Sequence, residues 1–320
     1  MPRCVSHPDF CSPSLRRHTT VVARTVNSHY GIRRFLLRRT DPHTAPDAPM
    51  KIVSWNINGI RAIAGRGFEA WLHANDADIV ALQEVRSPPE AVPAPLQNPE
   101  GWHTHISAAA RKGYSGVGLY ARQPWRTLAT SLNNEEFDVE GRVQIAHFGS
   151  LVLVNGYFPN GSGKDRDNGR VPFKLDFYRA LFDLLQPYVD AHQPVVVVGD
   201  FNTAHREIDL ARPRENLRTS GFLPEERQSF DGVLQRGWTD SFRHLHPETA
   251  DRYTWWSQRF GVRAKNIGWR IDYALLSPAA LPYLCAADIH DDVAGSDHCP
   301  ISVVLDRSVI HHPVAKVLHP

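Results

Sequence analysis

Short apolar segments that each end in a small cluster of polar residues recur along most of this chain. The clearest is Val195–Val198, an unbroken β-branched run typical of a buried central strand, which is soon followed by Asp200 and Asn202. The other predicted strands are Lys51–Asn56, Ile79–Gln83, Val117–Ala121, Val143–Ala146, Leu151–Tyr157, Ile271–Leu276 and Ile301–Leu305. Strand ends in a rigid sheet can point side chains into one cleft, so we expect these polar clusters to meet at a single site.

Helical segments alternate with these strands, which predicts an α/β fold. A short helix is expected at Gly67–His73, and loops at the Pro-rich Ser87–Pro99 and the polar Pro159–Pro172. A longer helix is expected at Lys174–Val189, with an apolar face that comprises Leu175, Tyr178, Leu181, Phe182 and Leu185. Because no internal linker interrupts the pattern, residues 50–306 are predicted to form one domain, followed by a short tail at 307–320.

Residues 1–49 have a different composition, rich in Arg, Ser, Thr, His and Pro, without sustained strand or helix periodicity. They carry a net charge of +5, and since the whole chain carries +2, the remainder carries −3. One interpretation is an Arg-rich, acid-poor transit peptide. The other is a disordered or non-native extension that an upstream start codon adds. We favour the second, because Met50 is the only methionine after Met1 and directly precedes the first predicted strand.

Composition excludes two classes of protein. No apolar run approaches the roughly 18 residues that span a bilayer, so we expect no membrane segment. The four cysteines are too few for a disulfide scaffold and form no Cys-x-x-Cys pair, which favours a reducing compartment.

The polar clusters supply the groups that phosphodiester hydrolysis requires: a site for a cation, a group that positions water, and donors for the phosphate oxygens. Hard cations such as Mg²⁺ prefer carboxylate and amide oxygens. Such oxygens are available at Asn56, Asn58, Glu84, Asp200, Asn202 and Asp297. His298 and Asp272 add an imidazole–carboxylate pair, and no Cys/His spacing indicates zinc. Each residue alone has a structural explanation, and only their joint occurrence indicates this chemistry.

Five motifs carry a resemblance to a known family. They are Ser54–Ala62 (SWNINGIRA), Leu82–Glu84 (LQE), Gly199–His205 (GDFNTAH), Asn266–Tyr273 (NIGWRIDY) and Gly295–Pro300 (GSDHCP). In this order they resemble the motifs of the exonuclease III and abasic-endonuclease family, over about residues 50–305. The resemblance implies a four-layered α/β sandwich of the deoxyribonuclease-I-like type. It also implies Mg²⁺-dependent hydrolysis of the DNA backbone at abasic sites, with 3′-end trimming or 3′–5′ exonuclease activity.

The resemblance further implies a role for each polar residue. Glu84 resembles the principal metal ligand, with Asn56 and Asp297 nearby. A second metal ion would use Asp200, Asn202 and His298. The sequence leaves the number of ions open, and Mn²⁺ is expected to substitute for Mg²⁺.

The remaining roles concern water and phosphate. Asp200 resembles the residue that orients or deprotonates the attacking water, and Asn202 resembles its partner. His298 resembles the phosphate-binding histidine, whose tautomer and positive charge Asp272 favours. Two further residues resemble the family's phosphate contacts, Tyr157 and Asn160.

Recognition of damaged DNA depends on other positions. Trp255, Trp269 and Ile271 match family positions that line a pocket for the flipped-out abasic sugar. Asn58 stands where some members have Asp, Trp255 replaces Phe, and the loop at 161–164 lacks an Arg that some members insert, which leaves the substrate preference open. Cationic loop residues are predicted to form a DNA-binding rim: Lys164, Arg166, Arg170, Arg212, Arg214, Arg218, Arg263 and Lys265.

The sequence therefore predicts a DNA-repair phosphodiesterase, monomeric and cytoplasmic, of bacterial type and associated with the nucleoid. Its expected partner is double-stranded DNA with abasic sites or 3′ ends. Two alternatives are a phosphodiesterase or phosphatase of the same fold that acts on inositol phosphates or lipids, and an inactive DNA-binding relative. The pair Trp269-Arg270 argues against the first, and the presence of every predicted catalytic residue argues against the second.

Overall fold

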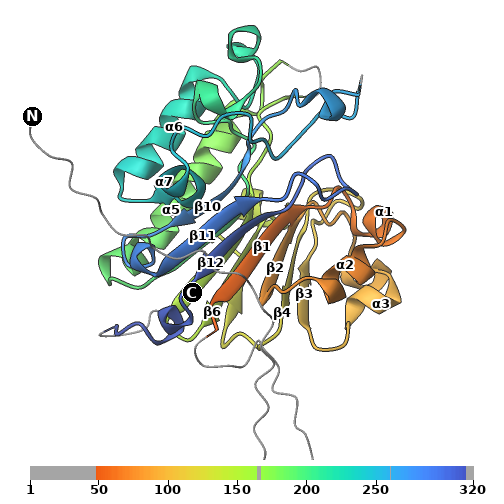
Figure 1. The fold of residues 1–320 in the computed structure, drawn as a ribbon, viewed down its shortest axis with the longest axis vertical. Helices are drawn as coiled ribbons and strands as arrows, with labels where there is room; N and C mark the ends of the chain where they lie inside the picture. Colours follow the sequence, from red (N-terminus) through yellow and green to blue (C-terminus); the bar gives the residue numbers. More distant parts are fainter. Residues whose placement is uncertain (1–47, 164–166, 260, 315–320) are drawn as a thin grey trace, which may run out of the picture. The chain divides into compact units, whose positions relative to one another are not determined.

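The computed structural model describes residues 48–163, 167–259 and 261–314. Within these ranges, the β-strands form two six-stranded sheets (Figure 1). The first sheet has the order β11 (Leu284–Ile289), β12 (Ile301–Leu305), β1 (Met50–Asn56), β2 (Ile79–Gln83), β4 (Val117–Ala121) and β3 (His103–Ser107). The second has the order β5 (Leu128–Ala129), β6 (Val143–Phe148), β7 (Leu151–Tyr157), β8 (Val195–Asp200), β10 (Asp272–Leu276) and β9 (Thr239–Asp240).

Alternating side chains on these strands divide the apolar residues of the strands among three buried clusters. On β1, Ile52 enters the cluster shared by both sheets, whereas Val53 enters the cluster on the outer face of the first sheet. On β8, Val196 belongs to the shared cluster and Val197 to the cluster on the outer face of the second sheet. Strands that bury both faces explain the unbroken apolar runs in the sequence.

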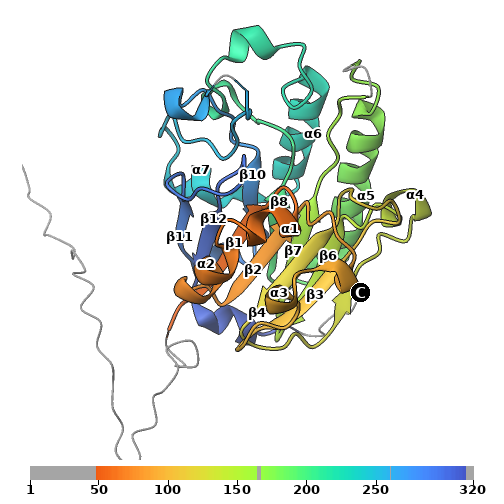
Figure 2. The same ribbon diagram turned by 90° about the vertical axis from the view of Figure 1, so that its right-hand side faces the viewer.

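Helices complete the outer clusters and give four layers (Figure 2). The first sheet is covered by α1 (Ile60–Ala64), α2 (Phe68–Ala74) and α3 (Ala94–Gln97), and the second by α5 (Val171–Asp190) and α6 (Pro224–Gln235). The other helical segments are α4 (Glu135–Asp138), α7 (Ser241–Leu245) and the 3₁₀ turns η2 (Pro89–Ala91), η3 (Glu207–Asp209), η4 (Pro213–Asn216), η5 (Arg263–Lys265), η6 (Leu281–Tyr283) and η7 (Arg307–His311). The predicted four-layered α/β sandwich is confirmed.

The strand register brings the polar ends of the strands together. Among the described strands, the parallel pairs are β1–β2, which aligns Asn56 with Gln83, and β7–β8, which aligns Tyr157 with Asp200. The antiparallel strand β10 begins at Asp272, opposite Asp200. Carboxyl ends of neighbouring parallel strands lie at the same edge of a sheet, so these residues converge as expected.

The predicted strand bounds agree with the structure for β2, β4, β7 and β12. Two outer strands of the first sheet, β3 and β11, are absent from the predictions, because their half-exposed sequences mix polar and apolar residues. The segment Ser87–Pro99 is not wholly a loop, since it contains η2 and α3. In α5, Lys174 and Phe177 are fully buried, whereas Leu175 lies only half-buried at the border of the apolar face.

The C-terminal boundary needs a correction. Residues 307–311, assigned to a tail, form η7, and its Val309 is fully buried in the shared core. Arg307 forms an ion pair of 2.6 Å with the buried Asp78, and the Ser150 amide donates to the Ile310 carbonyl at 2.8 Å. The domain therefore continues beyond residue 306. The N-terminal extension up to residue 47 lies outside the described residues.

None of the helices that the structure describes combines the length and apolar character needed to cross a membrane.

Candidate active site

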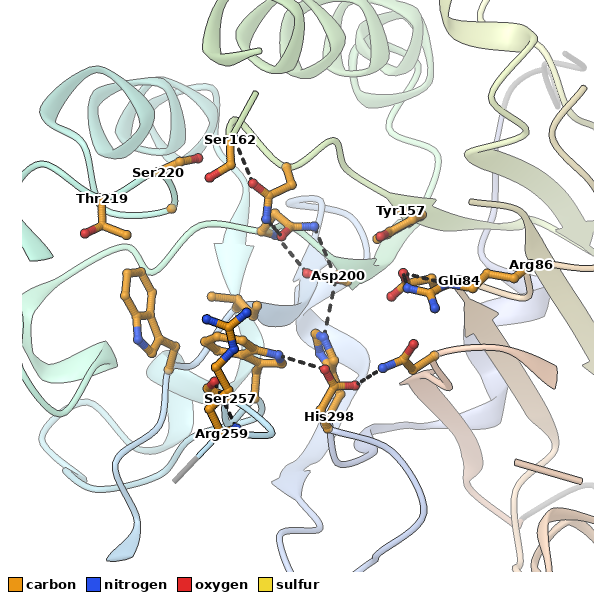
Figure 3. A pocket seen from close by; sticks show the side chains of 18 residues that line it. Glu84, Arg86, Tyr157, Ser162, Asp200, Thr219, Ser220, Ser257, Arg259 and His298 are labelled. Atoms are coloured by element: carbon orange, nitrogen blue, oxygen red, sulfur yellow. Dashed lines mark hydrogen bonds and ion pairs between the residues drawn. The ribbon is translucent and has the colours of Figure 1, made fainter. Parts of the chain in front are cut away.

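The polar strand ends surround a cavity of about 510 Å³ (Figure 3). Glu84, which follows β2, and Asp297 and His298, which precede β12, line it from the first sheet. Tyr157 and Asp200, at the ends of β7 and β8, line it from the second sheet. The remaining lining residues are Asn58, Arg86, Asn160, Ser162, Asn202, Thr219, Ser220, Gly221, Trp255, Ser257, Arg259, Trp269 and Ile271.

Asp200 is a buried carboxylate held by neutral amides. Its Oδ2 accepts hydrogen bonds from the side-chain amides of Asn56 at 2.9 Å and Asn202 at 3.2 Å. Its Oδ1 accepts from the Asn202 backbone N–H at 2.8 Å. Burial and the neighbouring Asp272 raise the pKa of Asp200 to about 7, against the opposing effect of His298. Asp200 can therefore exchange a proton near neutral pH.

His298 lies between two carboxylates. Its Nδ1 is 2.8 Å from Asp272 Oδ2, and its Nε2 is 3.8 Å from Asp200 Oδ2. Burial lowers the pKa of His298, but Asp272 and Asp200 outweigh burial and raise it to about 10. The ring is therefore an imidazolium at neutral pH, and Asp272 fixes its orientation. Asp272 lies behind the cavity wall rather than in it, as does Asn56.

Asn202 connects Asp200 to the phosphate-contact candidate Asn160. It adopts a left-handed backbone conformation (φ 51°), which Asn tolerates better than most residues. Its Nδ2 also donates to the Phe158 carbonyl at 3.0 Å, and its Oδ1 accepts from Asn160 Nδ2 at 3.1 Å. The turn after β8 thus holds two amide side chains at the cavity.

Glu84 is a partly exposed carboxylate of the site, with 15% of its side chain accessible to solvent, and it forms an ion pair with Arg86. Both residues have a positive φ (58° and 54°), an uncommon conformation that often marks functional sites. Arg86 Nε and Nη2 both donate to Glu84 Oε1. Among the described residues, Glu84 Oε2 therefore receives no hydrogen bond.

Asp297 is held by neutral donors from two segments. Its Oδ1 accepts from Asn58 Nδ2 at 2.7 Å, and its Oδ2 accepts from Trp255 Nε1 at 3.3 Å. Burial alone would raise the pKa of Asp297, but His298 and Asn58 lower it. Asp297 is therefore ionised at neutral pH.

Tyr157 retains its proton at neutral pH. Burial and the nearby Glu84 raise the pKa of Tyr157 well above its usual value. The Arg142 guanidinium lies over its ring at 4.7 Å and donates to its backbone carbonyl at 2.9 Å. The protonated hydroxyl group can therefore donate a hydrogen bond at the cavity.

An apolar wall closes one side of the cavity. The rings of Trp255 and Trp269 are 6.3 Å apart at 81°, and both pack against the cluster that contains Ile271 and Phe222. Gly221 (φ 95°) faces this wall, where an added Cβ would lie 3.2 Å from the Trp269 ring. This wall combines the three residues predicted for the sugar pocket.

Two groups of donors can hold a metal ion. Glu84 fits a hard divalent cation, because among the described residues its Oε2 receives no hydrogen bond, and a cation could replace the positive charge that Arg86 now supplies at Oε1. Asp200, Asp272 and His298 form a second group, with ligand atoms within 4.8 Å of one another. A metal ion in this second group would have to displace the proton of the His298 imidazolium, so Glu84 is the better candidate.

The predicted cationic rim stays a prediction for most of its residues, and two of them make structural contacts. Arg170 binds Glu140, and Arg263 donates to three backbone carbonyls, so both have structural roles. None of the predicted rim residues that the structure describes lines the cavity, and Lys164 and Arg166 lie outside the described residues. Instead, Arg86 and Arg259 line it. An adjoining cavity of about 500 Å³ is lined by Arg66, Arg86 and Arg259. Another, of about 460 Å³, is lined by Arg61 and Arg86.

Known proteins share this fold and these motifs. Residues 53–298 match the model of the Endonuclease/Exonuclease/phosphatase family. The chain is 42% identical over 261 residues to the DNA repair nuclease APEX1 of Danio rerio, across 81% of this chain and 83% of that protein. It is 38% identical over 258 residues to an exodeoxyribonuclease of Bacillus subtilis, across 80% of this chain and all of that protein.

Solved structures of similar proteins have the same fold as this chain. An AP endonuclease from Archaeoglobus fulgidus is 27% identical, with a TM-score of 0.72 over 80% of this chain and 99% of that chain. A 3′ phosphatase from Neisseria, bound to product DNA, is 30% identical, with a TM-score of 0.73 over the same shares. The chain therefore belongs to the Endonuclease/Exonuclease/phosphatase family. Its resemblance to the exonuclease III and abasic-endonuclease branch is confirmed.

The structure thus brings together every site residue predicted from the sequence, although the roles assigned to them stay predictions. Sequence reasoning missed the hydroxyl groups of Ser162, Thr219, Ser220 and Ser257 and the guanidinium groups of Arg86 and Arg259. The position of Arg86, two residues after the LQE motif, is the one signal that could have indicated its contact with Glu84.

Proposed function

We propose that this protein is a Mg²⁺-dependent DNA-repair phosphodiesterase that cleaves the DNA backbone at abasic sites and trims 3′ ends. One observation carries the proposal: the ionisable residues Asp200 and His298 line a cavity that also has an apolar wall. A carboxylate with a pKa of about 7 is suited to deprotonate water near neutral pH. The imidazolium is suited to bind the phosphate group that this water attacks.

The protein's own residues perform the following steps. The Asn202 side chain holds the attacking water in line with the phosphorus atom, and Asp200 accepts its proton. As the water oxygen bonds to phosphorus, the bond from phosphorus to the leaving sugar oxygen breaks, and that oxygen takes a proton from solvent. His298, Tyr157 and Asn160 donate hydrogen bonds to the phosphate oxygens, where negative charge increases in the transition state. When bound, Mg²⁺ would supply charge neutralisation at the phosphate. It would be held by Glu84, with Asn56 and Asp297 nearby, after release of Arg86.

The apolar wall supports abasic DNA as the substrate. An abasic sugar has no base and can leave the helix at lower cost than a normal nucleotide. Trp255, Trp269 and Ile271 offer it a small apolar surface next to the reacting phosphate. A highly charged inositol phosphate would gain little from this wall, which argues against that alternative substrate.

Arginines beside the cavity support double-stranded DNA as the partner. Arg61, Arg66, Arg86 and Arg259 line connected cavities that extend from the active site, and all four are exposed. We expect them to bind phosphates of the DNA strand. The affinity for DNA should then fall steeply with salt concentration, because bound phosphates release counterions.

The test is cleavage of a labelled duplex that contains one abasic site, with Mg²⁺ and with excess EDTA. We expect cleavage at the abasic site with Mg²⁺ and none in EDTA. A 3′-recessed undamaged duplex and a 3′-phosphate duplex, assayed in parallel, divide the activity among endonuclease, exonuclease and phosphatase. Undiminished cleavage in EDTA would contradict the role of the metal ion. Hydrolysis of inositol phosphates without DNA cleavage would contradict the whole proposal.

A further inference from the structure

A buried ion pair lies beneath the active site and has no part in the proposed chemistry. Lys174 on α5 and Glu226 on α6 have side chains with no exposed surface, and Lys174 Nζ is 2.6 Å from Glu226 Oε1. Lysine and glutamate are rarely buried completely. Removing such a pair from water costs free energy that their attraction only partly recovers, so a buried pair is weak evidence for a stabilising role.

The lysine of this pair holds the turn that follows Asp200. Its ammonium group donates to the backbone carbonyl of Asn202 at 2.6 Å. Asn202 has the left-handed conformation described above, and its N–H and side chain both bind Asp200. A fixed carbonyl at this residue therefore restrains the amide groups that surround the catalytic carboxylate.

The glutamate of the pair holds the opposite wall of the cavity. Glu226 Oε2 accepts from the backbone N–H groups of Gly221 at 2.5 Å and Leu223 at 3.1 Å, and Oε1 accepts from the Ser220 hydroxyl at 3.1 Å. Ser220 and Gly221 line the cavity, and Gly221 lies close to Trp269. The Gly221 carbonyl also accepts from Ala204 N–H at 2.7 Å.

A third segment approaches the same pair. A Cβ at Gly161 would lie 2.5 Å from Ser220 Oγ and 3.0 Å from Glu226 Oε1, so the backbone after Asn160 packs directly on this carboxylate. The pair thus lies where three cavity-lining segments meet: residues 160–162, the turn at Asn202 and residues 219–221.

We propose that Lys174 and Glu226 are positioning residues, which hold Asn202 beside Asp200 and hold the Ser220–Gly221 wall at the distance that the abasic sugar requires. They act through other residues and do not touch the substrate. The inference rests on the proposed function, because the distance it concerns lies between the water-activating carboxylate and the sugar pocket.

The decisive comparison uses the full chain with Lys174→Met, the double variant Lys174→Met/Glu226→Gln, and Arg307→Met. In Lys174→Met the carboxylate of Glu226 stays buried without its cation, so this variant should be less stable. The double variant buries no unpaired charge and should recover most of the melting temperature, yet the Asn202 carbonyl still lacks its donor. Arg307→Met is the matched control, since it breaks another buried ion pair at the opposite end of β1.

We expect both Lys174 variants to lower kcat on the abasic duplex by roughly 10- to 100-fold, as misplacement of catalytic groups does, while KM changes less than about threefold. Assays run well below each melting temperature should leave kcat of Arg307→Met unchanged. If kcat recovers together with the melting temperature in the double variant, the pair is only structural and the proposal is overturned. An unchanged kcat in folded Lys174→Met overturns it as well.

A spectroscopic measurement tests the inference without any activity. In protein labelled with ¹⁵N-glycine, the Gly221 amide should report its short hydrogen bond to Glu226. We expect its resonance to move in both Lys174 variants and to stay in place in Arg307→Met. An unmoved Gly221 resonance in the double variant overturns the positioning role. If the wild-type protein fails to cleave abasic DNA while the resonance moves as expected, the proposed function fails and the structural coupling remains.

Discussion

Two carboxylates at strand ends in the two sheets have opposite environments. Glu84, after β2, keeps 15% of its side chain exposed and forms an ion pair with the exposed Arg86. Asp200, at the end of β8, is 2% exposed and is surrounded by amides and by His298. The same placement at a strand end therefore gives one carboxylate that solvent reaches and another whose pKa burial raises to about 7. We expect this difference in burial to separate their proposed roles as metal ligand and proton acceptor.

The largest expected effect comes from the buried carboxylate. Asp200→Asn should lower kcat by roughly 10²–10⁴-fold while abasic DNA still binds, because the group that accepts the proton of water is lost. The substitution should also raise the free energy of unfolding at pH 8, by on the order of 1–3 kcal/mol. At this pH the buried carboxylate is ionised at a cost in free energy, whereas the asparagine amide is neutral.

The sign of this second effect follows from the raised pKa. The folded protein binds more protons than the unfolded chain between pH 3.8 and about 7, so the Asp200 contribution to stability falls as pH rises through that range. The difference in urea midpoint between the variant and the wild type should therefore be larger at pH 8 than at pH 5. Lost DNA binding with turnover intact would refute the assigned role.

The accessible carboxylate should behave differently. Glu84→Ala should lower activity by roughly 10- to 100-fold at low Mg²⁺, as loss of a metal-binding group does, and high Mg²⁺ should partly restore it. The measurement is kcat as a function of Mg²⁺ concentration for both proteins. Asp200→Asn, titrated in the same way, is the control, and we expect no rescue of that variant. Equal rescue of Glu84→Ala and Asp200→Asn by high Mg²⁺ would show that the two carboxylates do not differ in their roles.

A smaller effect is expected at the apolar wall. Trp269→Ala should reduce the ratio of kcat/KM for an abasic duplex over an undamaged one by roughly tenfold, since the enlarged pocket admits both sugars. Trp102→Ala is a suitable control, because Trp102 belongs to the cluster on the outer face of the first sheet. An unchanged ratio in folded Trp269→Ala and Trp255→Ala would show that the pocket lies elsewhere.

A third carboxylate, Asp209, extends the comparison of buried carboxylates to a residue whose effect is measured by the free energy of unfolding alone. Asp209 is as buried as Asp200, and burial works against its ionisation, but Arg270 and Arg243 overcome this and lower its pKa to about 2. Asp209→Asn should cost about 3 kcal/mol at neutral pH, because both arginines lose a charged partner. The exposed pair of Asp183 with Arg236 is the control, and Asp183→Asn should cost less than about 0.5 kcal/mol.

The pH dependence of Asp209 has the opposite sign from that of Asp200. Its pKa lies below the usual 3.8, so its contribution to stability is complete above pH 4 and is lost as pH falls toward 2. The lowered pKa accounts for about 2 kcal/mol of stabilisation. In urea unfolding, the difference between wild type and Asp209→Asn should shrink over that range, and a constant difference would contradict the assigned pKa.

Much of the fold and site could be predicted because local sequence carries it. Runs such as Leu151–Tyr157 bury both faces and end at fixed polar residues, so composition alone marks their length and their ends. The half-exposed edge strands β3 and β11 lack this signal. The contacts of Arg263 could not be predicted for a related reason, since a loop sequence does not tell whether an arginine meets solvent or donates to three carbonyl groups.

By itself, the sequence determined which buried central strands form, which polar residues end them and therefore which groups are available at one edge of the sheets. Only the tertiary structure decided the environment of each charge. It raised the pKa of Asp200 to about 7, left Glu84 partly exposed beside Arg86, and buried the side chain of Lys174 completely. The physical reason is that side-chain type and spacing follow the chain, whereas burial and ionic partners depend on contacts between residues as far apart as Asn56 and Asp200.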